Sequence, residues 1–283
     1  MSLPLPPPTI THCYRHADRE AGRRCTRCGN PACTDCLVQA NVGSHCLDCV
    51  KAAQPDLKTK VRYAAAKQHT PVTLAIIAIN VAIFFWMVSK SSGVLGGNRE
   101  ISREQFDLGL ARSLIQRDHE WYRVITSGFI HFGFIHIAFN MFILWQLGQM
   151  LERTLGPIRF SLLYFAGLLG GSAGVLILDK NSLTGGASGA VFGLMAAAAI
   201  AMHQQGINIM QTGVGRTLVM NLFLTFIIPN ISIGGHIGGL VAGAACGFVM
   251  LAPKWKKFPT WATYATPTAM SIAAFMVCYV VAN

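Results

Sequence analysis

Charge, and acidic charge above all, is scarce in this chain of 283 residues. Only 12% of the residues are charged and 52% are hydrophobic, whereas a soluble domain has about twice that charged share. Between Trp121 and the carboxyl terminus, the only carboxylates are Glu152 and Asp179. This shortage disfavours a transporter, which would place charged groups near the middle of the bilayer. It also leaves few candidates for the acidic member of a catalytic triad.

We expect no cleavable signal peptide either. The first residues are rich in proline and contain no hydrophobic segment of the kind found in a cleavable signal peptide. The net charge is +11, but the basic residues cluster beside long apolar runs. We therefore interpret them as signals of membrane topology and expect no nucleic-acid partner.

Long apolar runs recur from residue 71 onward and predict an all-α polytopic membrane protein. Basic clusters lie before the first run, after the second, before the fifth and after the sixth. The positive-inside rule places these four positions and the amino terminus in the cytoplasm. We expect the protein to lie in the plasma membrane of a bacterial cell. The loop at about 90–131 has balanced charges, which suits the outer face. Seven spans are predicted, at about 71–89, 132–151, 157–178, 187–204, 213–228, 233–251 and 262–281.

Cysteine is concentrated near the amino terminus. Seven of the nine cysteines lie within residues 13–49, and the other two, Cys246 and Cys278, lie in apolar runs where we expect core packing. The seven combine with one histidine into four pairs, each separated by two residues. Eight such ligands predict two four-coordinate zinc sites that are closed and structural. The pairs are Cys13 with His16, Cys25 with Cys28, Cys33 with Cys36, and Cys46 with Cys49.

The spacing leaves the pairing of these ligands open. A cross-braced module joins the first pair to the third and the second to the fourth, whereas a sequential module joins neighbouring pairs. His12 could replace His16, and His45 could replace Cys46. A disulfide knot is the alternative without metal, but the spacing and the cytoplasmic side disfavour it. The segment resembles a B-box-type zinc finger, so we expect residues 1–50 to form a cytoplasmic zinc-binding module. The module could bind a cytoplasmic protein, act as a sensor, or simply fold around zinc. A basic linker at 51–70 follows.

Polar side chains recur in the second, fourth and sixth spans. The second contains His136 and Asn140, four residues apart and so on one helix face; the fourth contains Ser188 and the sixth His236. All three spans enter from the outer face, and each polar group lies within about 10 Å of that boundary. Ionisable and polar groups inside a membrane are costly, so four at one depth indicate a functional site.

Helix packing is the alternative interpretation of the segment around Ser188. Gly185, Gly189 and Gly193 are spaced as in the small-residue faces of packed membrane helices. The segment also differs from the serine elbow, because Ala190 stands where Gly-x-Ser-x-Gly has its last glycine. The histidines at the same depth favour catalysis over packing alone.

A serine and an imidazole are the minimum for nucleophilic catalysis. We predict that Ser188 is the nucleophile and His236 the general base of a dyad. Glu152 lies at the cytoplasmic end of the second span, and Asp179 at the outer end of the third, where it could anchor a loop. His136 and Asn140 could donate hydrogen bonds to a developing oxyanion, beside the backbone N–H of Ser188. No metal is expected in catalysis.

These motifs resemble those of the rhomboid intramembrane serine proteases. His131, His136 and Asn140 are similar to the family's His-x4-His-x3-Asn pattern. The segment 186–189 is similar to its Gly-x-Ser-Gly motif, and 236–243 to its His-x2-Gly-x3-Gly motif. The segment Glu120-Trp121-Tyr122-Arg123 resembles the Trp-Arg motif of the first loop, with Tyr122 in place of a second tryptophan, and Gly235 stands where the family usually has alanine.

The resemblance implies a six-helix catalytic core at 71–251, with a cytoplasmic loop and a seventh helix at 252–283. It implies that Phe192 stacks on His236 and that the protein cleaves single-span membrane proteins near the outer face, in contact with lipid. Within this fold, Gly239 and Gly243 could face Gly189 and Gly193.

Two further expectations concern access and activity. The short fifth span and the loop at 229–230 are the predicted entry point for substrate and water. The alternative function is a catalytically silent rhomboid-like protein that binds or escorts membrane clients. Such relatives typically lack the serine or the histidine, and both are present here.

Overall fold

The computed structural model describes residues 11–40, 42–54, 56, 59, 70–96, 101–179, 182–228, 231–256 and 258–283. The chain divides into two compact units, Met1–Gln68 and His69–Asn283. Most of the predicted basic linker lies outside the described residues, as do Pro229 and Asn230 of the predicted entry loop.

The first unit is a small module built from two antiparallel hairpins. Strand β1 (Arg23–Arg24) pairs with β2 (Pro31–Ala32), and β3 (Leu37–Gln39) pairs with β4 (Ser44–Cys46). The 3₁₀ helix η1 (Thr34–Cys36) lies between the hairpins, and α1 (Leu47–Ala53) follows them. Among its described residues, the buried apolar ones are Cys13, Cys25, Ala32, Cys33, Cys36 and Cys46. Because so little apolar surface is buried, the cysteines themselves make up most of this core.

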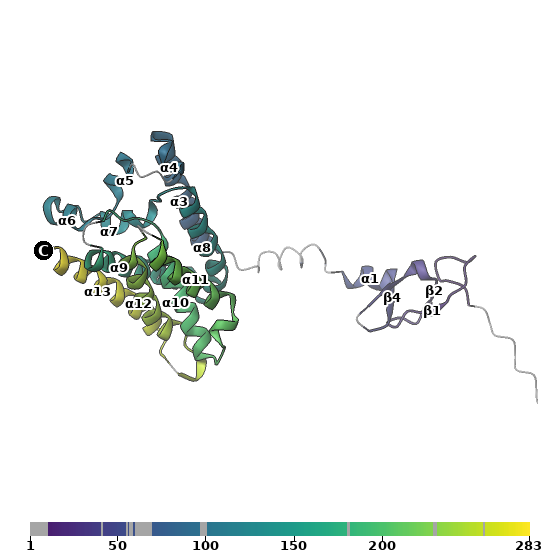
Figure 1. The fold of residues 1–283 in the computed structure, drawn as a ribbon. Helices are drawn as coiled ribbons and strands as arrows, with labels where there is room; N and C mark the ends of the chain where they lie inside the picture. Colours follow the sequence, from purple (N-terminus) through teal and green to yellow (C-terminus); the bar gives the residue numbers. More distant parts are fainter. Residues whose placement is uncertain are drawn as a thin grey trace, which may run out of the picture. The chain divides into compact units, whose positions relative to one another are not determined.

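The second unit is a bundle of long apolar helices, and it confirms the prediction of an all-α polytopic membrane protein (Figure 1). Five helices are long and apolar enough to cross a membrane, while α10 and α11 are shorter, with 17 and 15 residues. Every predicted span matches a helix, with ends that differ by at most four residues. The helices are α3 (Pro71–Lys90), α8 (Phe134–Leu155), α9 (Pro157–Leu178), α10 (Ser188–Gln204), α11 (Gly213–Ile227), α12 (Ile233–Met250) and α13 (Ala262–Ala282).

The predicted outer loop between α3 and α8 folds into short helices. The first turn of α5 is closed by a capping box, in which Ser102 accepts from the backbone N–H of Gln105 and the Gln105 side chain accepts from that of Ser102. The loop helices are α4 (Gly93–Gly96), α5 (Arg103–Leu108), α6 (Arg112–Asp118), α7 (Arg123–Thr126) and the 3₁₀ helix η2 (Ser127–Phe129). Two further 3₁₀ turns, η3 (Ile209–Gln211) and η4 (Lys254–Lys256), lie after α10 and α12.

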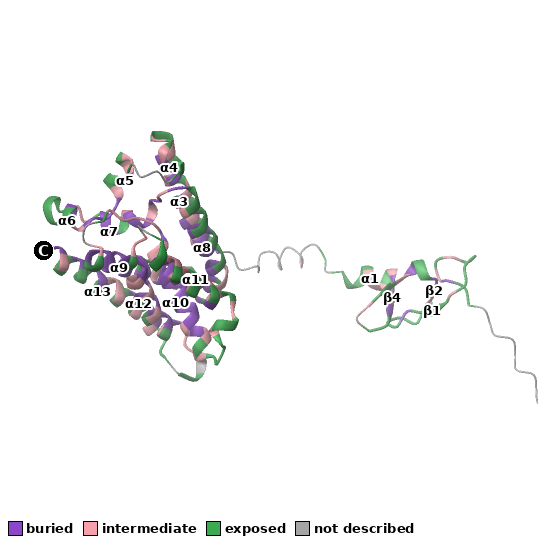
Figure 2. Ribbon diagram, in the orientation of Figure 1, coloured by how far each residue is buried: buried purple, intermediate pink, exposed green. Residues whose placement is uncertain are grey.

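Helix α9 is at the centre of the bundle. In its most apolar window, 67% of the residues are buried inside the protein, against 28% for α3 and 22% for α13. Figure 2 shows the same contrast, with buried residues concentrated along α9, α10 and α12. Helix α12 packs against both α9 and α10.

Glycine makes these contacts close. A Cβ atom added at Gly239 would overlap the carbonyl oxygen of Gly189, and one at Gly243 would overlap that of Gly193. The prediction that these pairs face each other is therefore confirmed. On the other side of α12, Gly238 meets the backbone of Gly170 in the same way. Helix α12 is thus held at backbone distance between α9 and α10, which positions the residues at its amino-terminal end.

The two carboxylate side chains that follow Trp121 both cap helices. Glu152, 2% exposed, accepts hydrogen bonds from the backbone N–H groups of Val72 and Thr73 at 2.9 and 2.8 Å. Asp179 accepts from the Ser232 hydroxyl at 2.5 Å and from the N–H of Gly234 at 3.1 Å. Both satisfy free N–H groups at the start of a helix, α3 and α12 respectively. Asp179 is therefore a loop anchor, as expected.

Candidate active site

Ser188 is the first residue of α10, and the chain reaches it through an unusual backbone conformation. Gly186 has φ +137°, which residues with a side chain rarely adopt, and its N–H donates to the carbonyl of Ser127 at 2.8 Å. A Cβ at Gly186 would lie 2.9 Å from Nε2 of His136 and 3.8 Å from Oγ of Ser188. Glycine at this position therefore leaves the space in which the imidazole of His136 lies beside the serine.

His236 lies in the first turns of α12, and its ring is fixed from two sides. One face stacks on Phe192 of α10, with ring centroids 4.0 Å apart and an interplanar angle of 19°. Its Nδ1 lies 2.7 Å from Oγ1 of Thr225 on α11. The side chain is 8% exposed. Three helices thus determine the orientation of one imidazole.

Ser188 and His236 are brought to the same end of α10 and α12 but are not hydrogen-bonded. Among the hydrogen bonds of the described residues, none joins these two side chains. Catalytic hydrogen bonds are often long in a substrate-free enzyme and shorten only when substrate binds.

His136 carries its proton on the nitrogen that lies beside Gly186. The backbone N–H of Phe132 donates to Nδ1 of His136 at 3.4 Å. In a neutral imidazole that accepts at Nδ1, the hydrogen is on Nε2. Nε2 is the atom that lies against Gly186, so His136 presents a donor at the entrance to α10.

Asn140 and His131 take supporting positions around His136. Nδ2 of Asn140, 6% exposed, donates to the carbonyl oxygen of His136 at 2.9 Å, so one of its two N–H donors is used within α8. His131 is fully buried, and its Nε2 accepts from the N–H of Ala187 at 3.5 Å. The rings of His131 and His136 meet edge to face, 5.0 Å apart. His131 therefore contacts both Ala187, the residue before Ser188, and the imidazole ring of His136.

A small cavity of about 40 Å³ opens beside Ser188. A single water needs about 10–15 Å³ by this measure, so the cavity has room for a few. Its lining includes several hydroxyl groups that can hydrogen-bond water, from Ser127, Ser172, Thr184, Ser188 and Ser232.

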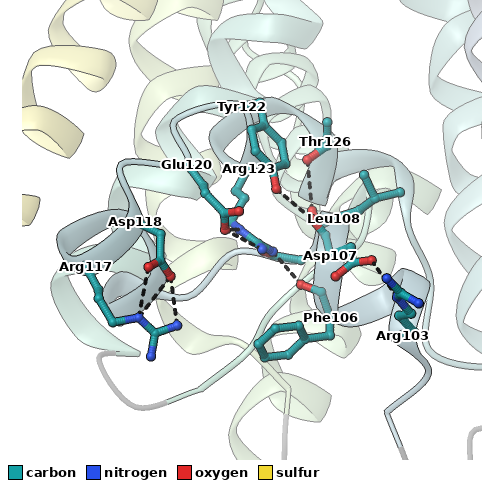
Figure 3. Close-up of polar contacts among 11 residues, drawn as sticks. Arg103, Phe106, Asp107, Leu108, Arg117, Asp118, Glu120, Tyr122, Arg123 and Thr126 are labelled. Atoms are coloured by element: carbon teal, nitrogen blue, oxygen red, sulfur yellow. Dashed lines mark hydrogen bonds and ion pairs between the residues drawn. The ribbon is translucent and has the colours of Figure 1, made fainter.

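The first loop is organised around Arg123, which is only 2% exposed (Figure 3). Its guanidinium donates to Glu120 at 2.6 Å, to the carbonyl of Gly109 at 2.8 Å and to that of Phe106. Figure 3 also shows Thr126 donating to the carbonyl of Leu108, at 2.9 Å. These bonds tie α5 to α7.

The same loop is hydrogen-bonded to the backbone segment that precedes Ser188. Leu110 and Thr184 exchange backbone hydrogen bonds of 2.8 Å in an isolated antiparallel bridge. Trp121 stacks on Tyr279 of α13, with centroids 5.6 Å apart. The loop therefore links the seventh helix to the strand-like segment that leads into α10.

The eight predicted metal ligands gather into two groups, in the cross-braced pairing. The ligand atoms of each group all lie within 4.8 Å of one another. Nδ1 of His16 faces three sulfur atoms, at 3.8 Å from Cys13, 3.5 Å from Cys33 and 3.4 Å from Cys36. The second group consists of Cys25, Cys28, Cys46 and Cys49. His16 and Cys46 thus take the positions for which His12 and His45 were alternatives.

All nine cysteines are free, so the module contains no disulfide. The pKa of the Cys13 thiol is about 6: burial raises it, but backbone hydrogen bonds from Cys33, Arg15 and His16 outweigh burial. The pKa of Cys25 is likewise about 6, because backbone bonds outweigh burial. Thiolates and imidazole in sets of four are the donors that Zn²⁺ prefers, so the residues fit this metal.

Sequence reasoning missed Thr225. A signal was present, because Thr217, Asn221 and Thr225 are spaced four apart and form a polar stripe on an otherwise apolar helix. The stripe is hydrogen-bonded within α11: Asn221 donates to the carbonyl of Thr217 at 2.8 Å, and Thr225 to that of Asn221 at 2.7 Å.

Fold and site together define a multi-pass membrane protein with serine, histidine and asparagine side chains gathered at one end of its central helices. Comparison with known proteins supports a family for it. Residues 118–253 match the model of the Rhomboid domain, and the similarity to rhomboid proteins supports assignment to the rhomboid family.

Three relatives illustrate the range of the similarity. Rhomboid protease GluP of Bacillus subtilis is 29% identical over 189 residues, which are 66% of this chain and 36% of that protein. YdcA of the same organism is 27% identical over 192 residues, 66% of this chain and 92% of its own length. RHOMBOID-like protein 6, mitochondrial, of Arabidopsis thaliana is 32% identical over 164 residues, 54% and 52% of the two chains. The chain thus spans about a third to a half of two of these relatives.

Proposed function

We propose that this protein is an intramembrane serine endopeptidase that cleaves single-span membrane proteins through a dyad of Ser188 and His236. The observation that carries the proposal is the meeting of three helices at one site. Helix α10 contributes Ser188, α12 contributes His236 stacked on Phe192, and α8 contributes His136 beside the serine. Nucleophile, base and oxyanion donor are the groups that acyl transfer needs.

The reaction follows from these groups. Oγ of Ser188 attacks the scissile carbonyl carbon, and Nε2 of His236 takes the hydroxyl proton. The tetrahedral oxyanion accepts hydrogen bonds from Nε2–H of His136 and from the backbone N–H of Ser188. Collapse of this intermediate breaks the C–N bond, and His236 returns the proton to the leaving amine. Water from the cavity beside Ser188 then hydrolyses the acyl-enzyme, with His236 again as base.

Asn140 supports this site by a second route. Its bond to the carbonyl of His136 stabilises the helix turn that carries the donor imidazole. Its remaining N–H is free to help with the oxyanion or with a bound water. We therefore assign the larger share of oxyanion stabilisation to His136.

The membrane topology that we propose follows from the distribution of basic residues. The amino terminus is cytoplasmic, the dyad lies near the outer face of a bacterial plasma membrane, and substrates reach it through lipid. Helix α11 is loosely packed against the rest of the membrane unit, since among its residues only Gly215 and Thr225 are buried. We propose that substrate and water enter beside it.

The amino-terminal module is proposed to hold two structural zinc ions. Bound zinc would stabilise a fold with almost no apolar core, in which five of the eight ligands, Cys13, Cys25, Cys33, Cys36 and Cys46, are buried. The module faces the cytoplasm in this topology, where it is available to a protein partner.

Incubation with a model single-span substrate tests the proposal. Purified wild-type protein in detergent should cleave it, and Ser188→Ala and His236→Ala should not. The two substitutions together should cost no more than either one, because the residues act as a unit. Cleavage that persists in Ser188→Ala would contradict the proposal that the protein is a serine protease. Binding of the substrate without cleavage by wild-type protein would favour the silent escort function instead.

A further inference from the structure

A neutral imidazole has one N–H and one lone pair, and the partner of one nitrogen decides the role of the other. For His236 to accept the proton of Ser188, its lone pair must be on Nε2 and its hydrogen on Nδ1. In serine proteases with a triad, a carboxylate accepts from Nδ1–H and so selects this tautomer. Here Glu152 and Asp179 are both bound to helix amino termini.

The partner of Nδ1 in His236 is instead the hydroxyl of Thr225, at 2.7 Å. That hydroxyl has a single hydrogen and also lies 2.7 Å from the carbonyl oxygen of Asn221, one helical turn earlier. A carbonyl oxygen can only accept. The Thr225 hydrogen is therefore directed to Asn221, and its oxygen accepts from Nδ1–H of His236. The reverse direction would leave the Asn221 carbonyl without this bond and would place the hydrogen of His236 on Nε2, where it blocks proton transfer from Ser188.

The surroundings of Thr225 make the bond more than incidental. Thr225 is 2% exposed, while most large side chains of α11 face outward, among them Met220, Phe223 and Phe226. A buried hydroxyl is costly unless it is hydrogen-bonded. Of its two hydrogen bonds, one is made to Nδ1 of His236, and the other, to the carbonyl of Asn221, directs the Thr225 hydrogen away from that nitrogen. Phe192 fixes the plane of the ring, and Thr225 fixes which nitrogen carries the hydrogen.

We propose that Thr225 is a positioning residue that selects the Nδ1–H tautomer of His236, in the place where a triad has its acid. This rests on the proposed serine-protease function and deepens it. Because the hydroxyl is neutral, it orients the imidazole without adding a negative charge beside it. It also ties the catalytic histidine to α11, a different helix from those that carry Ser188 and Phe192.

The rate at which a fluorophosphonate probe labels Ser188 tests the proposal directly, because it reports nucleophile activation without a protein substrate. Thr225→Val keeps the size and branching of threonine but cannot accept from Nδ1–H. We expect it to slow labelling and to lower kcat by about 10²-fold, the lower end of what general-base catalysis contributes, with KM little changed. Thr225→Ser keeps the hydroxyl and should restore most of the rate.

Thr268→Val is the matched control. Thr268 makes the same bond to the carbonyl four residues earlier, at 2.9 Å from the oxygen of Tyr264, but lies exposed on α13. It should label at the wild-type rate. Equal rates for wild type and Thr225→Val would overturn the proposal, as would a Thr225→Ser variant as slow as Thr225→Val. If the wild type is labelled no faster than Ser188→Ala, the proposed function itself fails.

A second measurement needs no folded valine variant. The ¹⁵N chemical shifts of labelled histidine distinguish a protonated ring nitrogen from one with a lone pair. The His236 signals are those missing from His236→Gln. In the wild-type protein near neutral pH, we expect Nδ1 protonated and Nε2 unprotonated. The opposite tautomer would overturn the proposal.

Discussion

The imidazole of His236 lies flat against the phenyl ring of Phe192, with centroids 4.0 Å apart and planes at 19°. The two residues belong to different helices, α12 and α10, and Phe192 is one turn after Ser188 on α10. The stack therefore sets the distance between the histidine and the serine as well as the plane of the imidazole. Loss of the ring should disturb both.

Phe192→Leu tests the importance of this stack. The leucine keeps apolar bulk but loses the flat surface, and aromatic pairs are worth about 0.5–1.5 kcal/mol beyond the area they bury. We expect a decrease in kcat of about tenfold, with a small change in KM. Phe192→Tyr should retain most of the activity. Steady-state cleavage of a model substrate provides both constants, and a leucine variant with unchanged kcat would contradict the prediction.

The two proposed oxyanion donors, His136 and Asn140, should not contribute equally to kcat. His136 presents Nε2–H beside Gly186, whereas Asn140 uses one N–H on the carbonyl of His136. Loss of one oxyanion donor commonly costs about 10²–10³ in kcat. We expect His136→Ala to reach this range and Asn140→Ala to cost less.

Single-turnover cleavage at saturating substrate separates these effects from binding. Both variants should bind a substrate-derived transmembrane peptide with nearly wild-type affinity. If Asn140→Ala weakened binding alone, the asparagine would be a substrate-positioning residue. A larger loss of kcat in Asn140→Ala than in His136→Ala would mean that Asn140 is the main oxyanion donor.

The contact between α10 and α12 should tolerate no added methyl group. A Cβ at Gly239 would overlap the carbonyl oxygen of Gly189, which is backbone and cannot rotate away. Overpacking of this kind typically costs about 1–3 kcal/mol. Gly239→Ala should therefore lower the thermal unfolding midpoint in detergent and reduce cleavage, because α12 carries His236.

Gly213→Ala is the control for this substitution. Nothing lies within 4 Å of a Cβ atom at Gly213, which is also a helical glycine. This variant should unfold at the wild-type temperature or slightly above it, because alanine favours helix. A Gly239→Ala variant as stable as Gly213→Ala would contradict the close backbone contact.

Metal analysis should find two zinc ions per chain, both in the amino-terminal module. Cadmium substitution and ¹¹³Cd NMR then test the pairing, because three sulfurs with one nitrogen give a different shift from four sulfurs. In the cross-braced arrangement, Cys36→Ser should remove the signal of the site that contains His16. In a sequential arrangement it would instead remove the four-sulfur signal. His12→Gln should change neither.

Catalysis should be independent of this module. A protein lacking residues 1–50 should cleave a model substrate in detergent at close to the full-length rate, and a strong chelator should not inhibit it. Inhibition of this shortened protein by chelation would place a metal in the membrane unit and contradict the dyad mechanism.

Much of this architecture could be predicted from the sequence, because the signals were local. Apolar segments long enough to span a bilayer predicted seven helices whose ends differ from the observed ones by four residues or fewer. The largest difference is at the end of α8, because the predicted span stops at residue 151, just before Glu152. The helix continues to Leu155, because the Glu152 carboxylate is paired with N–H groups of α3 and is not solvated. The gathering of polar groups on α8, α10 and α12 could be predicted, because each group lies near the outer end of its own predicted span.

Only the tertiary structure decided which partner each polar group or metal ligand has, because the sequence offered several possible partners for each. Four equally spaced ligand pairs are compatible with two pairings, and the cross-braced one follows from where the hairpins bring the chain. Asp179 could have served His236, but the position of α9 against α12 directs it to the helix amino terminus. The hydroxyl of Thr225, eleven residues from His236 on a different helix, reaches Nδ1 only because α11 lies against α12. The sequence determined which groups are buried in the membrane, because burial follows from local composition, while hydrogen-bond partners depend on distances that exist only after the helices have packed.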